Sequence, residues 1–459
     1  MPGWRKTWAL GLAALVARLL VVRWAAPRFP AAADGFYYDT LAHRLAAGQG
    51  YTWLWPDGAV TYAAHYPVGY PLMLAGAYRL FGAYPAAGMA VSAILGAAAT
   101  IAMHRLALRP TPTWRADAAA LVVAAHPALV PYTAAFMTEA IAAYLLVIAA
   151  SLGAVARDRP RRWPWLAGAG LVLGVATLVR PQCLLFAPVL GLLATPPGSA
   201  VGRAWAAALV TAVTLAVCAP WTVRNCVRME RCALVSVNGG WNLLIGEQTT
   251  TGGWGEVSVP PPCREVWAEA AKDVCFERAA RAAILEHPGS WLAKMPGKLA
   301  ATFDYIGASP WYMHTSNGAA FGDDDKRLDG ALETLVTRLL LVGALVACAR
   351  MHGPRVRARA VIAALGGLSA VTLHAWIGYV AIVAALLALG VRALARAPVL
   401  VTWTCAFVLG TAATHAVFFG AGRYGLVVLP FVGALAFVDG GRASPVPPEP
   451  IASERSSRS

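Results

Sequence analysis

Charged side chains are scarce in this chain. Of its 459 residues, 13% are Asp, Glu, Lys or Arg, whereas 58% are hydrophobic. Soluble domains usually carry about a quarter charged residues. The mean hydropathy of +0.57 points the same way. These values exclude a water-soluble domain as the main body of the chain and indicate many membrane spans.

Acidic residues are fewer than basic ones. The 23 acidic residues face 38 basic ones, which gives a net charge of +15. A positive balance is also typical of proteins that bind nucleic acid. Here, however, the Lys and Arg residues cluster in short gaps between apolar runs, as in the cytoplasmic loops of membrane proteins. We therefore expect membrane lipids as partners and no nucleic acid.

The sequence also lacks an internal repeat and any His/Cys spacing typical of a structural zinc site. Four of its cysteines lie in or at the ends of apolar runs, where we expect inert packing residues: Cys183, Cys218, Cys348 and Cys405. The other four fall in one polar segment, where three pairings are possible: Cys226, Cys232, Cys263 and Cys275.

Closeness in sequence favours the disulfides Cys226–Cys232 and Cys263–Cys275. The second pair sets a condition on the helix predicted for 262–286, a stretch with apolar residues at helical spacing. Twelve residues of continuous helix span about 18 Å, beyond the roughly 7 Å between Cα atoms that a disulfide allows. Either the helix begins after Cys263, or the pairing crosses between the two regions.

Apolar runs long enough to cross a bilayer recur along the chain. A membrane-spanning helix needs about 20 mostly apolar residues, and about twelve segments qualify. Arg5 and Lys6 precede the first, as in a signal peptide, but Arg18 and Arg23 interrupt its apolar run, so we expect an uncleaved helix. The predicted fold class is all-α and polytopic, with spans at 8–26, 86–106, 117–135, 139–156, 164–180, 182–197, 204–221, 332–349, 359–375, 377–395, 398–417 and 424–439.

Basic residues predict the orientation of these spans. Their clusters alternate from one gap to the next, so that all face the cytoplasm if both termini are inside. Two long segments, 27–85 and 222–330, then face the outside as loops of a single module covering 1–438. The polar, Pro/Ser-rich stretch 440–459 is predicted to be a disordered cytoplasmic tail.

The stretch "DGFYYDTLAHRLAAGQGYTW" (34–53) follows the first span and is unusually polar for this chain. Asp34, Tyr37 and Asp39 are expected near the outer membrane surface, and His65 lies in a later turn of the same segment. One interpretation is an interfacial aromatic belt with a capping aspartate. The other is a site in which a carboxylate takes part in acid/base chemistry.

Four further ionisable residues are predicted at span ends on the same face: Glu139, Arg180, Arg224 and Arg423. Each taken alone is compatible with a snorkelling side chain or a helix cap. Together they would offer a carboxylate for acid/base work and arginines for an anionic phosphate. The acidic run "GDDDKRLD" (322–329) could bind a divalent cation, but we expect an acidic cap before a helix that begins near 331.

Several motifs, in order, resemble bacterial polytopic glycosyltransferases of the GT-C fold, in the protein mannosyltransferase and lipid A aminoarabinose transferase superfamily. The resemblance covers about residues 10–438, and "PWTVRNCVRMERCALVSVNGGWNLL" is its most specific motif. The other motifs are "DGFYYDTLAHRLAAGQGYTW", "YPVGYPLMLAGAYRLFG", "HPALVPYTAAFMTEA", "ILEHPGSWLAKMPGKLA" and "GRYGLVVLP".

The resemblance implies an enzyme of the bacterial inner membrane whose site faces the periplasm. It would move a sugar from a polyprenyl-phosphate donor to a lipid, glycan or protein acceptor. The family's first-loop acidic pair reads Asp34-Gly35 here, with Asp39 a possible substitute for the second acid. Catalytic roles fall on Asp34 and Glu139; no metal ligand is assigned, although a divalent metal is possible. Substrate or donor-phosphate contacts fall on Tyr37, Asp39, His65, Arg180, Arg224, Asn225, Asn238, Arg423 and Tyr424.

Two other functions share this kind of sequence. A lipid-linked-sugar transporter or flippase also has many spans and intramembrane arginines, but it is expected to show internal repeats and broken helices in matched halves. An O-antigen ligase or polymerase also uses a lipid-linked sugar, but it transfers a longer chain.

Overall fold

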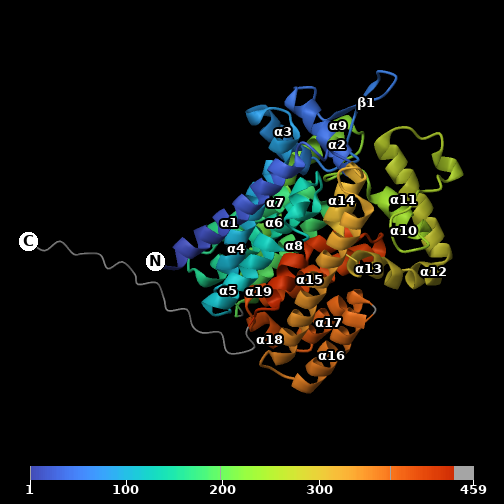
Figure 1. The fold of residues 1–459 in the computed structure, drawn as a ribbon. Helices are drawn as coiled ribbons and strands as arrows, with labels where there is room; N and C mark the ends of the chain where they lie inside the picture. Colours follow the sequence, from blue (N-terminus) through green and yellow to red (C-terminus); the bar gives the residue numbers. More distant parts are fainter. Residues whose placement is uncertain (1, 197, 306, 373, 439–459) are drawn as a thin grey trace, which may run out of the picture.

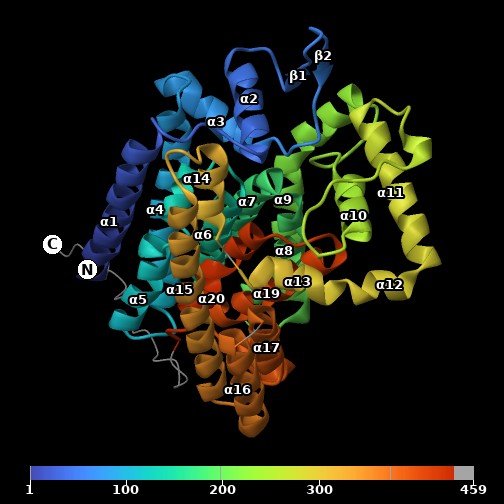
Figure 2. The ribbon, with the colours of Figure 1, turned by 45° about the vertical axis from the view of Figure 1, so that its right-hand side comes forward.

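The computed structural model describes residues 2–196, 198–305, 307–372 and 374–438. Its body is a bundle of helices, with two polar segments gathered toward one end of it (Figures 1 and 2). The predicted tail 440–459 lies outside the described residues.

Helices make up the whole of the bundle within the described residues. Its elements are α1 (Pro2–Ala25), α4 (Pro85–Ala107), α5 (Thr113–Ala125), η1 (Pro131–Ala134), α6 (Glu139–Asp158), α7 (Trp163–Val179), η2 (Pro181–Leu185), α8 (Phe186–Leu193), α9 (Ala200–Arg228), α15 (Asp323–Arg350), α16 (Val356–Thr372), α17 (Ala375–Leu387), α18 (Val391–Arg396), α19 (Val399–Val417), η4 (Gly422–Val427) and α20 (Leu429–Leu435).

The two polar segments connect α1 to α4 and α9 to α15. The first contains α2 (Asp34–Ala46), the antiparallel hairpin of β1 (Thr52–Leu54) and β2 (Val60–Tyr62), and α3 (Gly69–Phe81). The second contains α10 (Gly239–Gln248), η3 (Pro261–Cys263), α11 (Glu269–Glu286), α12 (Pro288–Ala293), α13 (Met295–Phe303) and α14 (Ala308–Ser316). The sequence did not predict the hairpin, whose register pairs Trp53 with Thr61.

The predicted all-α polytopic class is confirmed. Six of the described helices are long and apolar enough to cross a membrane: Trp4–Ala25, Pro85–Ala107, Glu139–Asp158, Ala200–Arg228, Asp323–Arg350 and Val399–Val417. Shorter apolar helices lie at Trp163–Val179, Pro181–Leu193 and Ala375–Leu387. The predicted number of about twelve full-length spans is therefore not confirmed.

Three of the predicted spans are broken. In 117–135, α5 ends at Ala125 because His126 precedes a proline and takes an extended conformation. In 377–395, α17 and α18 are separated at Gly390, whose φ of 80° leaves the right-handed helix. Of the third, the described residues 424–438 contain only the end of the 3₁₀ turn η4 and the 7-residue α20. A run of about 20 apolar residues therefore does not guarantee one continuous helix.

The acidic run before α15 is a helix start, as predicted, but the helix begins at Asp323 rather than near 331. Three aspartates occupy its first turn, where negative charge is favoured by the helix dipole. The Gly322 amide donates to Asp325 Oδ2 at 3.0 Å.

Both predicted disulfides are present, Cys226–Cys232 and Cys263–Cys275. Cys263 lies in η3 and helix α11 begins only at Glu269, so the condition on the second pair is met. The predicted helix is thus shorter than 262–286. The four remaining cysteines are free and buried, as expected of packing residues.

Candidate functional site

Asp34 opens helix α2 at the point where the chain leaves α1. Its side chain is 34% exposed. The Oδ2 atom accepts a hydrogen bond from Arg423 Nη2 at 2.7 Å, and Oδ1 accepts one from the Tyr66 hydroxyl at 3.3 Å. A carboxylate that is oriented from two sides and still reaches solvent is suited to accept a proton.

Glu139 is a second carboxylate, and it is almost completely buried. Arg180 Nη1 donates to its Oε1 at 2.8 Å, and Arg423 Nε lies 3.5 Å from the same oxygen. The Tyr132 hydroxyl donates to Oε2 at 2.9 Å. Because Arg423 also contacts Asp34, one guanidinium joins the two carboxylates.

Helix ends bring these four charged side chains together. Asp34 and Glu139 are the first residues of α2 and α6, where a carboxylate is favoured by the helix dipole. Arg180 directly follows α7, and Arg423 lies in η4, just before α20. The four side chains come from separate parts of the chain, and we name them the charged cluster.

Aromatic rings form the surroundings of the two arginines. The guanidinium carbons of Arg180 and Arg423 lie 5.0 and 5.3 Å from the centre of the Tyr424 ring. His415 stacks on that ring with a centroid distance of 4.4 Å, and Trp311 lies 5.8 Å from Arg423. Rings at this distance attract the guanidinium charges and limit their movement.

The charged cluster is suited to bind an anion. Its two carboxylates balance its two arginines, so an incoming phosphate would exchange with carboxylate oxygens for guanidinium N–H groups. Arginine offers a planar fork of donors that matches phosphate geometry. Of the ionisable residues predicted on one face, Glu139, Arg180 and Arg423 meet, and Asp34 joins them, whereas Arg224 lies apart. The roles of all of them stay predictions.

Arg224 has a different set of partners. Its Nη1 donates to the Ala63 carbonyl and its Nη2 to the Tyr51 carbonyl, both at 2.8 Å. The guanidinium also lies 4.7 Å from the Trp221 ring centre. These hydrogen bonds hold the residues on either side of the β1–β2 hairpin against α9. The structure therefore places Arg224 as a support of the first polar segment, and its contact with a donor phosphate stays a prediction.

Asn225 and Asn238 shape the turn after α9. The buried Asn225 side chain donates to the Ala233 and Val235 carbonyls at 3.0 and 3.2 Å. Asn238 Oδ1 accepts from the Ser236 hydroxyl at 2.9 Å and precedes α10. Substrate contact of either side chain stays a prediction.

Asp39 lies in the interior of α2, so it does not cap a following helix as one sequence interpretation held. It accepts a hydrogen bond from the Tyr78 hydroxyl of α3, and His43 Nε2 lies 3.6 Å from its Oδ2. Asp39 is thus part of the α2–α3 contact.

His65 lies where the two polar segments meet. Its backbone amide and that of Ala64 donate to Glu269 Oε2 at 3.0 and 2.7 Å. Burial lowers the pKa of the His65 ring to about 4, although Asp34 acts in the opposite direction. The ring is therefore neutral near pH 7. Within the described residues there is no group of three or more His, Cys, Asp or Glu side chains that could hold a metal.

Gly35 explains why the second residue of the predicted acidic pair is missing. A Cβ atom at this position would lie 2.8 Å from the Phe136 carbonyl oxygen and 2.9 Å from the Tyr312 hydroxyl. A longer side chain would need either neighbour to move. The close approach of α2 to this region therefore requires glycine beside Asp34.

Sequence reasoning missed two tyrosines and one glutamate that contact the site. Tyr132 is seven residues before Glu139 in the motif "PYTAAFMTEA" and could have been suspected from that motif. Tyr66 opens the motif "YPVGYPLMLAGAYRLFG" and could likewise have been suspected, whereas Glu269 carries no local signal, because its partners lie in another segment. Burial and the neighbouring Asp34 raise the pKa of Tyr66 above its usual value, so its hydroxyl remains a donor.

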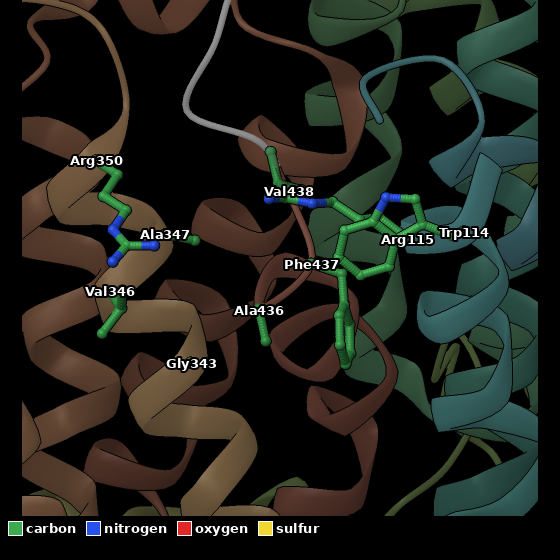
Figure 3. Close-up of a pocket in the computed structure, with 9 residues that line it drawn as sticks. All are labelled: Trp114, Arg115, Gly343, Val346, Ala347, Arg350, Ala436, Phe437 and Val438. Carbon is green, nitrogen blue, oxygen red and sulfur yellow. The ribbon is translucent and has the colours of Figure 1, made fainter. Parts of the chain in front are cut away.

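A cavity of about 210 Å³ lies elsewhere, between α5, α15 and the end of α20. Figure 3 shows Arg350 on one wall and Arg115 on the other, with Phe437 and Ala436 between them. None of the residues that line it belongs to the charged cluster. The cavity is therefore separate from the candidate site.

Comparison with known proteins gives one family match. The model of the dolichyl-phosphate-mannose-protein mannosyltransferase family matches residues 65–223. This confirms, over that part of the chain, the resemblance found in the motifs. No curated protein sequence matches the chain.

Solved structures with similar helical arrangements are distant in sequence. The oligosaccharyltransferase AglB from Archaeoglobus fulgidus, in complex with an inhibitory peptide and a dolichol-phosphate, is 14% identical with a TM-score of 0.45. The match covers 94% of this chain and 50% of that one, so this chain spans half the length of the archaeal protein. ArnT from Cupriavidus metallidurans, bound to undecaprenyl phosphate, is 13% identical with a TM-score of 0.41, and the match covers 95% of this chain and 78% of that one.

Proposed function

We propose that this chain is a membrane glycosyltransferase of the GT-C type, which transfers a sugar from a polyprenyl-phosphate donor to a hydroxyl acceptor at the outer face of a bacterial inner membrane. The observation that carries the proposal is the charged cluster, in which an accessible carboxylate lies beside two arginines. The family matched by residues 65–223, named for dolichyl-phosphate-mannose, supports a lipid-phosphate donor.

Asp34 is the general base in this proposal. The acceptor hydroxyl transfers its proton to Asp34 as its oxygen forms a bond to the anomeric carbon. The bond between that carbon and the phosphate oxygen breaks, and the electron pair leaves with the polyprenyl phosphate. Attack from the face opposite the phosphate inverts the anomeric configuration.

Arg180 and Arg423 hold the departing phosphate. Negative charge grows on the leaving oxygen as the bond breaks, and fixed cations in a partly buried site stabilise that charge more than water does. Of the three arginines to which the sequence assigned donor-phosphate contacts, Arg224 is left out here, because it is engaged with carbonyls of the first polar segment.

Glu139 is a positioning residue in this proposal. It lies between the two arginines and is too buried to meet a bulky acceptor. Its contacts with Arg180 and Arg423 keep both guanidinium groups pointed at the same place until a phosphate takes over their N–H groups. The role differs from the catalytic one that the motif suggested for this position.

The test uses the purified full chain in lipid nanodiscs. It is incubated with a set of polyprenyl-phosphate sugars that carry a label in the sugar, together with candidate lipid, glycan and peptide acceptors. The transfer of label to an acceptor and the release of polyprenyl phosphate are both measured. We expect consumption of at least one donor by the wild type and loss of that activity in Asp34→Asn. Asp57→Asn is a matched control, since Asp57 lies in the exposed hairpin turn.

The rival functions predict other results. A flippase would move the labelled lipid between leaflets of a proteoliposome and leave its sugar–phosphate bond intact. A ligase or polymerase would ignore donors with a single sugar and use lipid-linked oligosaccharides. Either result would contradict the proposed single-sugar transfer.

A further inference from the structure

Four aromatic side chains form a continuous surface beside Asp34. Tyr37 lies at its centre: its ring stacks on Tyr66 at 5.0 Å between centroids with an interplanar angle of 21°, and lies 5.1 Å from Trp53. Phe36 contacts Tyr37 at 5.7 Å and Trp53 at 6.4 Å. We name these four residues, Phe36, Tyr37, Trp53 and Tyr66, the aromatic ledge.

The ledge is built from three pieces of the first polar segment. Phe36 and Tyr37 come from α2, Trp53 from β1, and Tyr66 from the turn before α3. Figure 1 places β1 and α2 at the same end of the bundle. The hairpin, which sequence did not predict, is what brings Trp53 over the α2 rings.

Much of the ledge remains accessible. Phe36 is 53% exposed and Tyr37 39%, and Trp53 is half-buried. Within the described residues, neither the Tyr37 hydroxyl nor the Trp53 indole N–H has a hydrogen-bond partner. Aromatic side chains with an unpaired polar tip offer both a flat apolar face and a directional contact to a ligand.

One end of the ledge touches the proposed base. The Tyr66 hydroxyl donates to Asp34 Oδ1 at 3.3 Å, while the Tyr66 ring stacks on Tyr37. The rings continue on the other side through His65 to Trp241 of the second polar segment, at 4.9 and 5.4 Å. A molecule lying on the ledge would therefore reach Asp34 with its edge.

An interfacial aromatic belt is the main alternative for these rings. A belt requires only that rings face the lipid headgroups, and it gives no reason for a hydrogen bond between one ring and a carboxylate that also contacts Arg423. The cavity between α5 and α15 is another place where a ligand could bind. Nothing in its lining indicates what would occupy it.

We infer that the aromatic ledge binds a pyranose ring of the acceptor, and that the acceptor is therefore a glycan or a glycolipid. Since Tyr37 lies against both Tyr66 and Trp53, the apolar C–H face of a pyranose would pack on the face of Trp53 that Tyr37 leaves free. Its hydroxyl groups would meet the Tyr37 hydroxyl and the indole N–H. A hydroxyl at the edge of the same ring would then lie toward Asp34. This inference rests on the proposed function and narrows its acceptor class.

The test measures glycan binding without any donor. The purified full chain in nanodiscs is mixed with a panel of neutral, amino and acidic pyranose trisaccharides, with the open-chain polyol sorbitol as a negative ligand. Saturation-transfer NMR, with irradiation of the aromatic protons, reports which sugar protons lie on protein rings. We expect transfer to the C–H protons of one pyranose face for at least one trisaccharide, and none to sorbitol.

Two variants and one control decide where the glycan binds. Tyr37→Ala and Trp53→Ala should each weaken binding by roughly three- to tenfold, in line with the usual strength of ring contacts. Trp55→Ala is the matched control, because Trp55 is an exposed hairpin residue whose indole N–H already donates to Thr61 Oγ1 at 2.9 Å. Elution volume on size exclusion verifies that each variant is folded.

Three results would overturn the inference: no trisaccharide in the panel binds, binding is equal in all variants, or Trp55→Ala weakens it as much as Trp53→Ala. Lipids brominated near the headgroup give a further check. If they quench the tryptophan fluorescence of the wild type more than that of the Trp53→Phe variant, the ledge lies in the membrane interface and the inference fails. If glycan binding behaves as expected but the wild type consumes no donor, the proposed function fails while the glycan site stands.

Discussion

Asp34 and Arg423 are 389 residues apart in the sequence, yet their side chains meet at 2.7 Å. Burying charged groups is costly unless they are paired, and here each carboxylate has an arginine. Individual side chains of the cluster can therefore be tested by substitutions that keep their size.

Asp34→Asn keeps the shape of the side chain and removes the base. We expect turnover of a lipid-linked sugar to fall by about 10²–10⁴-fold, the usual cost of losing a general base. Asp39→Asn should have a small effect, because the amide oxygen can still accept from Tyr78. Steady-state turnover of the two purified variants gives the answer. Activity of Asp34→Asn together with inactivity of Asp39→Asn would move the base to Asp39.

Arg423→Gln removes a cation from the proposed phosphate site. Charge-assisted hydrogen bonds contribute about 1.5–3 kcal/mol, so donor use should weaken by roughly one to two orders of magnitude. Arg423→Lys should recover part of that loss, since it restores charge without the planar fork. The measurement is turnover against donor concentration.

Arg224→Gln should act differently from Arg423→Gln. Its loss frees the Tyr51 and Ala63 carbonyls, so we expect a lower melting temperature of the protein and a smaller change in donor dependence. Measuring both the melting temperature and donor turnover of each variant separates the two effects. An unchanged melting temperature with a donor defect as large as that of Arg423→Gln would return Arg224 to the phosphate site.

Two disulfides stabilise the elements outside the bundle, each by closing a short loop. Cys226–Cys232 closes the turn after α9, and Cys263–Cys275 ties η3 to α11. Chain-entropy arguments for loops of this length give about 2–3 kcal/mol each. Asn225, in the last turn of α9, donates to carbonyls of the turn after α9, so the disulfide and these hydrogen bonds act on the same backbone.

Replacing both members of one pair by serine should therefore lower the melting temperature in the absence of reductant. Cys218→Ala is the control, because Cys218 is a free buried thiol. Peptide mapping without reduction should recover the two linked peptides from the wild type. Four unmodified thiols in these positions, or a cross-pairing, would contradict the assignment.

Across the molecule, the six candidate membrane spans and the two polar segments imply a single orientation. Clusters of basic residues favour the cytoplasm, so we predict that the charged cluster and the aromatic ledge lie on the outer side. A site on that side would meet a donor whose sugar has already crossed the membrane.

Cysteines introduced at exposed positions report this orientation directly. Thr250→Cys, in the second polar segment, should react with a membrane-impermeant maleimide in intact cells, whereas Arg161→Cys, in the gap between α6 and α7, should react only after lysis. The parent chain measures background, since its four free cysteines are buried. Labelling of Arg161→Cys alone in intact cells would invert the topology and the location of the site.

Local chemistry was sufficient for several features that the structure bears out. Low charge and repeated apolar runs indicate membrane helices, because hydrocarbon excludes charge and requires every backbone group to be paired within the span. Closeness in sequence was enough to favour the two cysteine pairs over the other pairings. Asp34, Glu139 and Arg423 were suspected because ionisable groups beside apolar runs are costly and therefore uncommon.

Which of these groups meet was decided only by the packing of the helices. Arg180 and Arg224 both follow long apolar runs, and nothing in their local sequence tells that one reaches Glu139 while the other reaches the carbonyls of Tyr51 and Ala63. The breaks in three predicted spans, the hairpin that carries Trp53 and the Tyr66–Asp34 hydrogen bond also depend on distant segments. A hydrogen bond depends on positions to within a few tenths of an ångström, and those positions are determined by how helices far apart in the chain pack against one another.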